Sequence, residues 1–193
     1  MNFIKTNLLK KTILLCITNI ALFAEPSGFY AEIGGGLGLE DTQKTESLTF
    51  VYDQGYFASL ALGYQLDLFK FEFEEIYKSD KLHSVSTDGK YSVPIDGELT
   101  MNSQMFNTYY SGYNRESKLF STIGLGMGIS TIDAASTTKD SGIFSAQAML
   151  SVGYPVYENL ILSTKYRYFY TLKSDNFKAK SDSLVSLSLR YHF

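Results

Sequence analysis

In eight segments between residues 29 and 193, apolar side chains recur at every second position, and this period of two constrains the fold more than any other feature. Successive side chains of a β-strand point to opposite faces, so the alternation predicts strands with one apolar face. No segment keeps a helical repeat long enough to compete, and none after the amino terminus is apolar for the roughly 18 residues of a membrane-spanning helix. Eight segments alternate, namely 29–39, 56–64, 69–73, 106–110, 121–129, 144–154, 160–170 and 185–193.

Composition excludes several classes of protein. The 193 residues are 45% hydrophobic and 15% aromatic, which is too apolar for a disordered chain. A single cysteine excludes an internal disulfide framework. With 17 Lys and Arg against 20 Asp and Glu, the chain has no basic excess for binding nucleic acid. One domain is expected at this length.

Residues 1–24 have the features of a secretory signal peptide. Three lysines precede an apolar run, and Ala24 supplies a small residue at the predicted cleavage point. Cys16 is not preceded by a small residue, so we do not expect lipidation. Cleavage would leave residues 25–193 as one barrel domain with 14 basic residues, 20 acidic residues and no cysteine, which suits an oxidising compartment.

The connections between the alternating segments differ in length at their two ends. Short connections are expected at 66–68, 111–118 and 155–159, and long polar ones at 40–54, 79–100, 131–141 and 171–182. An even strand number with short turns at one end and long loops at the other is typical of bacterial outer-membrane barrels. The sequence therefore predicts an all-β, eight-stranded antiparallel up-and-down transmembrane β-barrel. A soluble barrel of the lipocalin type is the alternative, but it would turn its apolar face inward.

Charged residues and glycines share the less apolar face of the predicted strands. An eight-stranded barrel is just wide enough to be filled by side chains, so long charged side chains need small residues opposite them. Segments 29–39 and 121–129 each carry a G-x-G-x-G run on this face. Because an unpaired buried charge is costly, we expect a structural network of ion pairs in the lumen. Its predicted members are Glu32, Lys70, Glu72, Glu74, Lys165, Arg167 and Arg190.

The last strand ends in an aromatic residue at the carboxy terminus. Counted back from the end, its apolar positions are Phe193, Tyr191, Leu189, Leu187 and Val185. These five residues resemble the signal by which the outer-membrane assembly machinery recognises its clients. The mature chain resembles the small eight-stranded outer-membrane proteins, the family that includes the OmpA transmembrane barrel, OmpX and the Ail-like and Opa-like surface proteins. The resemblance implies a location in the bacterial outer membrane, in contact with its lipid and lipopolysaccharide.

Aromatic residues gather at the ends of the predicted strands, as expected of girdles at the two membrane interfaces. Near the short turns lie Tyr64, Phe69, Tyr110, Tyr113, Tyr154, Tyr157, Tyr191 and Phe193. Toward the long loops lie Tyr56, Phe57, Tyr168 and Tyr170. Glu75 departs from the pattern, because alternation turns its side chain toward lipid. Either a β-bulge at Glu74 and Glu75 turns both inward, or the apolar band ends there.

Candidate catalytic residues are few. Glu72 and Glu74 lie about 7 Å apart on one face by strand geometry, which would suit an acid–base pair, but nearby basic residues favour ion pairs. The two histidines are His83, beside Ser84, and His192. Barrel enzymes that modify lipid A or phospholipid need a His and a Ser near the lipid-facing rim. No cluster has metal-ligand spacing, so no catalytic residue, metal or cofactor is predicted.

The longest predicted loop contains a strong hairpin signal. Asp88 and Gly89 stand between two alternating runs. We hypothesise that the flanking strands continue beyond the membrane and present an edge that binds a host or extracellular ligand by strand addition. A solvated loop with a tight turn is the alternative. Three functions stay open: a structural or adhesion-type surface protein, a narrow porin-like channel, and a lipid-modifying enzyme.

Overall fold

A computed structural model describes most of the predicted barrel domain. The described residues are 27–39, 42–44, 48–52, 55–87, 91–114, 116–134, 138–174 and 179–193. The predicted signal peptide, residues 1–24, and the predicted turn residues Asp88 and Gly89 lie outside them. Within the described ranges, no helix is long and apolar enough to cross a membrane.

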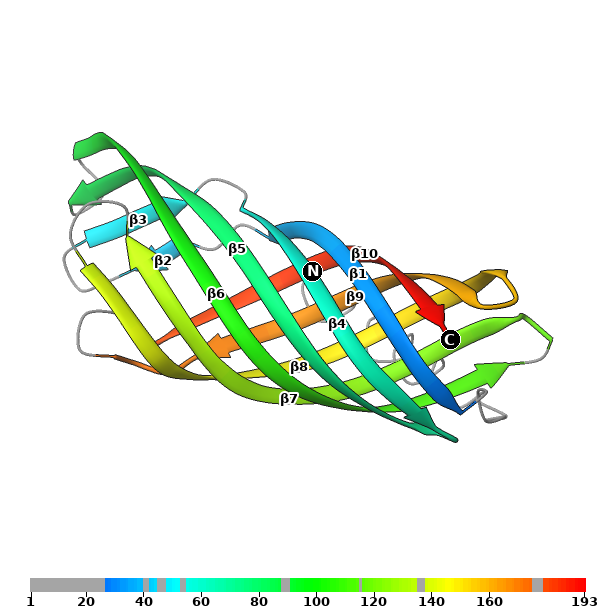
Figure 1. Cartoon of the computed structure of the whole chain (residues 1–193). Helices are drawn as coiled ribbons and strands as arrows, with labels where there is room; N and C mark the ends of the chain where they lie inside the picture. The colour runs from blue at the N-terminus through cyan, green and yellow to red at the C-terminus, as the bar shows by residue number, and fades with distance from the viewer. Residues whose placement is uncertain are drawn as a thin grey trace, which may run out of the picture.

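The described elements are all strands. Their bounds are β1 (Gly28–Leu39), β2 (Thr42–Lys44), β3 (Leu48–Tyr52), β4 (Tyr56–Leu66), β5 (Phe69–Thr87), β6 (Tyr91–Asn114), β7 (Leu119–Ala134), β8 (Thr138–Tyr157), β9 (Leu160–Thr171) and β10 (Lys180–His192). All of them except β2 and β3 form an antiparallel barrel wall, in which each strand pairs with its neighbours in chain order (Figure 1). The predicted eight-stranded all-β fold is confirmed.

The barrel closes between its first and last strands. β1 pairs with β10 from Tyr30–His192 to Leu39–Ser183. Beyond the ladder, the backbone N–H of Phe193 donates to the carbonyl oxygen of Phe29 at 3.0 Å. Both ends of the wall therefore meet at the short turns, which we call the turn end. The opposite end, at the outer parts of β5 and β6, is the loop end.

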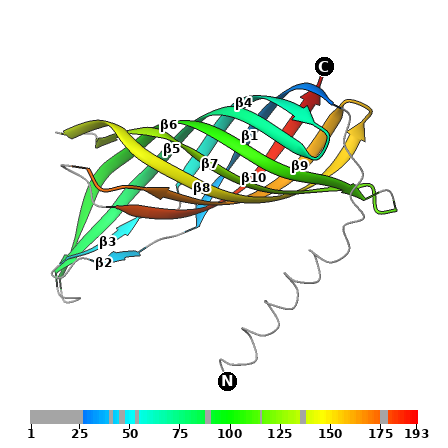
Figure 2. The same ribbon diagram turned by 90° about the horizontal axis from the view of Figure 1, so that it is seen from below.

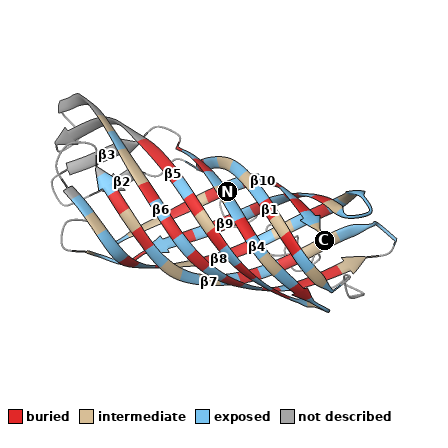
Figure 3. Cartoon of the chain, in the orientation of Figure 1, coloured by how far each residue is buried: buried red, intermediate tan, exposed pale blue. Residues whose placement is uncertain are grey.

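Side-chain exposure alternates along the wall as the sequence predicts (Figure 3). On β7, for example, Ile123, Leu125, Met127 and Ile129 are all more than half exposed. The polar residues that alternate with such side chains in the wall face a filled lumen and are buried. A lipocalin-type barrel has the opposite arrangement, with a wet exterior, so this alternative is excluded.

The loop end contains strand pairing beyond the eight alternating segments. β5 and β6 pair as far as Thr87 and Tyr91, in agreement with the hypothesis that the strands around Asp88 and Gly89 continue past the barrel. The predicted loop 131–141 also contains strand, because β7 and β8 pair as far as Ala134 and Thr138. The β3 strand pairs with the outer part of β5, and β2 pairs with β3, so the sheet extends past the rim of the barrel (Figure 2). Strands in water need no apolar face, which is why period-two patterning revealed neither β2 and β3 nor the extension of β7 and β8.

The structure also decides two questions of side-chain direction. The pairing of β5 with β4 and β6 runs without a shift through Glu74 and Glu75, so the β-bulge alternative is excluded at these described residues and Glu75 faces outward, as alternation predicts. Phe57 was assigned to the loop-side girdle, but its side chain points into the lumen and is 3% exposed. Its neighbours Tyr56 and Ala58 face outward instead, because the strand alternates.

The seam between β1 and β10 provides a test of the packing with two adjacent glycines. A Cβ atom on Gly36 would collide with the backbone of Val185 and Ser186, whereas a Cβ on Gly35 would make an ordinary contact on the outer face. We expect Gly36→Ala to lower the free energy of unfolding by about 1–3 kcal/mol, because the close strand backbones must separate. Gly35→Ala should change it by less than about 0.5 kcal/mol. Urea unfolding in lipid vesicles would measure both, and equal effects would contradict the close approach.

Candidate functional site: the filled lumen

The first ion-pair group of the lumen lies nearest the seam. Glu32 on β1 is 4% exposed and accepts from Lys165 Nζ at 2.7 Å and from Arg190 Nε at 2.9 Å. Glu32 and Arg190 are direct partners in the β1–β10 register, and Lys165 comes from β9. One carboxylate thus joins three strands at the closure of the barrel.

The second group lies across the lumen and is centred on Glu74. Arg167 Nη2 and Nη1 donate to the two carboxylate oxygens of Glu74 at 2.6 and 3.1 Å, in a bidentate pair. Asn107 Nδ2 donates to the same carboxylate at 2.8 Å, and Arg167 Nη1 also donates to Gln147 Oε1 at 2.8 Å. The group connects β5, β6, β8 and β9. Such a group leaves Glu74 no role as a free general base.

Glu72 is held by hydrogen bonds from neutral donors. Tyr109 Oη donates at 2.8 Å, and Tyr30 Oη and Asn107 Nδ2 each donate at 3.0 Å. Lys70 donates to Thr122 Oγ1 at 3.3 Å and lies 5.4 Å from the centroid of the Tyr109 ring. The structure thus places all seven residues of the predicted network in one buried assembly, five in the two ion-pair groups and Glu72 and Lys70 around Tyr109.

The lumen glycines make room for aromatic rings. A Cβ on Gly63 would overlap the ring of Tyr30, and a Cβ on Gly124 would overlap the ring of Tyr109. Tyr30 and Tyr109 are the two phenols that donate to Glu72. Sequence reasoning assigned the glycine space to charged side chains and missed these tyrosines, because both lie outside the charged set used to define the lumen.

An apolar layer follows the charged groups toward the loop end. Ile76 comes two residues after Glu74 on β5 and is fully buried. It packs in one cluster whose members are Phe57, Ile76, Met101, Met105, Ile132, Ile143, Phe169 and Leu184. The sequence did not reveal this layer, since an apolar residue on the lumen face of a strand looks like a break in the alternation.

A second charged layer lies beyond the apolar one. Lys78 and Lys180 each contact both Asp80 and Asp182, at 2.5 to 3.2 Å. These four residues, the upper cluster, connect β5 with β10. Lys78 and Asp80 continue the even-numbered series of Lys70, Glu72 and Glu74 along β5, so extending that register would have identified them. The lumen is therefore charged, apolar and charged again from the turn end to the loop end.

The remaining sequence candidates are placed apart from one another. The ring of His192 packs against that of Tyr30, with centroids 5.5 Å apart, at the turn end. His83 and Ser84 belong to the outer part of β5, where side chains lie outside the described residues. No group of three or more His, Cys, Asp or Glu could hold a metal ion within the part of the chain that the structure describes.

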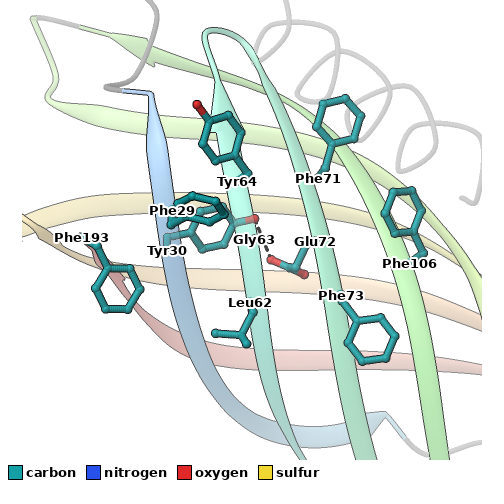
Figure 4. Close-up of a pocket in the computed structure, with 10 residues that line it drawn as sticks. All are labelled: Phe29, Tyr30, Leu62, Gly63, Tyr64, Phe71, Glu72, Phe73, Phe106 and Phe193. Carbon is teal, nitrogen blue, oxygen red and sulfur yellow. Dashed lines mark hydrogen bonds between the residues drawn. The ribbon is translucent and has the colours of Figure 1, made fainter.

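The outer surface carries a groove of about 520 Å³ near the turn end (Figure 4). It runs over β1, β4, β5 and β6, and its walls are outward-facing aromatic and aliphatic side chains. Tyr30, Gly63 and Glu72 border it from the lumen side. The outward members are Phe29, Leu62, Tyr64, Phe71, Phe73, Phe106 and Phe193.

Comparisons with known proteins agree with this architecture. No family model matches the chain, and no curated protein does. The crystal structure of Neisserial surface protein A superposes with a TM-score of 0.66 at 17% identity, covering 88% of this chain and 100% of that one. The outer membrane protein OprG from Pseudomonas aeruginosa gives a TM-score of 0.58 at 13% identity, covering 88% and 98%. At these identities the likeness shows a shared fold.

The fold and the surface define the class of protein. A closed antiparallel barrel with an apolar exterior and a polar, side-chain-filled interior is an outer-membrane-type β-barrel. Its fold is that of the small eight-stranded barrels represented by Neisserial surface protein A and OprG. The predicted location in the bacterial outer membrane follows from this class.

The Glu74–Arg167 pair allows a double-mutant test of the lumen network. We expect Arg167→Met to lower the free energy of unfolding by about 3–5 kcal/mol, because it leaves a buried carboxylate without its cation. Adding Glu74→Gln should recover most of that loss, since the charge is then gone. Urea unfolding in vesicles would measure the cycle, with the exposed turn substitution Glu116→Gln as control. Additive losses would show that the pair is not coupled.

Proposed function

We propose that the protein is a structural or surface-interaction barrel of the outer membrane, acting through the hairpin at its loop end and not through its lumen. The observation that carries the proposal is the extension of β5 and β6 beyond the barrel wall. β6 pairs with β7 only from Leu99 onward, while its pairing with β5 continues to Tyr91. Within the described residues, the edge of β6 that faces away from β5 thus has no paired strand over residues 91–98.

An unpaired edge of this kind can add a partner strand through backbone hydrogen bonds. On the other side of the hairpin, β3 already covers the edge of β5. Pro94 removes one N–H from the open edge and limits continuous pairing, which is how edge strands avoid self-association. We infer that an extended segment of a host or extracellular surface protein would pair on this edge.

Shortening the hairpin tests the surface-interaction role. Replacing residues 83–96 with an Asn-Gly turn removes the open edge and keeps Asp80, so the upper cluster stays intact. We expect cells that display this variant to lose adhesion to surfaces coated with extracellular-matrix proteins and to cultured epithelial cells. A control variant that changes only the sequence of residues 88–90 should adhere like the parent. Unchanged adhesion of the shortened variant would favour a purely structural role.

The layered lumen supports a closed barrel as opposed to a channel. Ions would have to cross two charged layers and the apolar cluster around Ile76 and Phe169, both fully buried. We expect the purified protein in planar bilayers to give no large, stable single-channel currents. Replacing Phe169 and Met105 together with alanine should introduce measurable conductance, because it opens the apolar layer. Large currents from the unmodified protein would overturn the closed lumen.

We also propose a non-enzymatic role and a function for the last strand. Glu72 and Glu74 are buried and bound by several donors, an environment suited to structure and not to proton transfer. The five residues of the predicted assembly signal all face outward and are exposed, where assembly machinery would reach them before the barrel closes. They are Val185, Leu187, Leu189, Tyr191 and Phe193.

A further inference from the structure

A carboxylate and an amide lie side by side on the largely apolar exterior of the barrel, two residues from the exposed Asn102. Glu75 on β5 and Gln104 on β6 are direct partners across the two strands, and alternation turns both outward. Cross-strand partners have Cβ atoms about 4.5–5.5 Å apart. We call Glu75 and Gln104 the exterior polar pair.

The exterior polar pair lies at the loop-side border of the apolar band. On β5 it is followed by Tyr77 in the next outward position toward the loop end, and it is preceded by Phe73. Tyr77 and Tyr56 are both exposed, as expected of a girdle at the outer interface. The pair is thus one outward position from that girdle, at the border between the aromatic side chains and the apolar band. A carboxylate at this depth is unfavourable unless it receives hydrogen bonds.

Among the described residues, neither Glu75 nor Gln104 has a hydrogen-bond or ion-pair partner, and the two are not bonded to each other. The lumen carboxylates Glu72 and Glu74 of β5, by contrast, accept from several donors. A lipid that covers this face of the barrel would be able to supply the missing donor and acceptor groups.

The apolar groove begins directly below the exterior polar pair. Phe73 precedes Glu75 by two residues, Phe106 follows Gln104 by two, and both are groove residues that pair with each other. From there the groove extends to Phe29 and Phe193 at the turn end (Figure 4). A polar site at one end of an apolar groove matches an amphiphile with a polar head and a hydrocarbon tail.

We propose that this surface binds a 3-hydroxyacyl chain of an outer-leaflet lipid, as carried by lipopolysaccharide. The chain hydroxyl would donate to the Glu75 carboxylate, and the Gln104 amide would donate to the acyl carbonyl two carbons away. The hydrocarbon tail would lie in the groove against Phe73 and Phe106. Ordinary phospholipid esters offer acceptors only, so they cannot satisfy a carboxylate. The inference rests on the outer-membrane placement given above.

Two simple esters separate the contribution of the chain hydroxyl to binding from that of a lipid headgroup. Methyl 3-hydroxytetradecanoate and methyl tetradecanoate differ only in that hydroxyl and carry no phosphate. We expect the full barrel in nanodiscs, analysed by native mass spectrometry, to retain the hydroxylated ester roughly tenfold more, the size of one hydrogen bond to a charged group. Glu75→Leu with Gln104→Leu should abolish this preference. Phe73→Ala should weaken the binding of both esters.

A control variant on the opposite wall of the barrel tests whether the preference belongs to this site. Thr164→Leu makes the same kind of polar-to-apolar change on the exposed outer face of β9, on the far side of the barrel, and should keep the preference. The double variant Glu75→Leu with Gln104→Leu and the control Thr164→Leu remove polar groups only from the outer surface, so both proteins should fold. Equal retention of the two esters by the inserted parent protein would overturn the site, as would dimers that depend on the exterior polar pair. Failure of the parent to insert into bilayers would overturn the placement itself.

Discussion

Every backbone polar group of a chain that crosses a membrane must find its partner within the protein, and the rest of this structure follows from that requirement. The β1–β10 ladder meets it by closing the sheet. Once the sheet is closed, alternate side chains must face lipid or a narrow interior. Glu32, which joins β1, β9 and β10, shows that the closure also fixes where charge can be buried.

The lumen is stabilised by two charged layers with an apolar layer between them. Glu74 and Arg167 form a bidentate pair, Glu72 is held by phenols and an amide, and the Lys78–Asp80 contact belongs to a separate group nearer the loop end. An apolar layer separates the lower and upper charges. The residues of each charged layer depend on one another, because removing one partner leaves the other as an unpaired buried charge. Such an interior suits a rigid scaffold, and it leaves the exterior and the loop end as the surfaces available for interaction.

Those two surfaces present different chemistry. The loop end offers backbone hydrogen-bonding groups along β6, suited to an extended peptide. The lipid-facing wall offers a carboxylate, an amide and a groove of aromatic side chains, suited to a hydroxylated acyl chain. A barrel of this size thus carries its candidate interactions on its outside, since its inside is occupied by its own side chains.

The sequence by itself determined the fold class, because alternation, the lengths of connections and the aromatic terminus are all local patterns. It also placed seven charged residues on the lumen face, since a strand alternates its faces without reference to distant residues, but it did not identify the four charged residues of the upper cluster. The tertiary structure alone decided which of them pair, and it brought in Tyr30 and Tyr109 across Gly63 and Gly124. It also excluded a β-bulge at Glu74 and Glu75, which the sequence left open. These outcomes depend on register and on contacts between strands far apart in the chain, which a period of two does not encode.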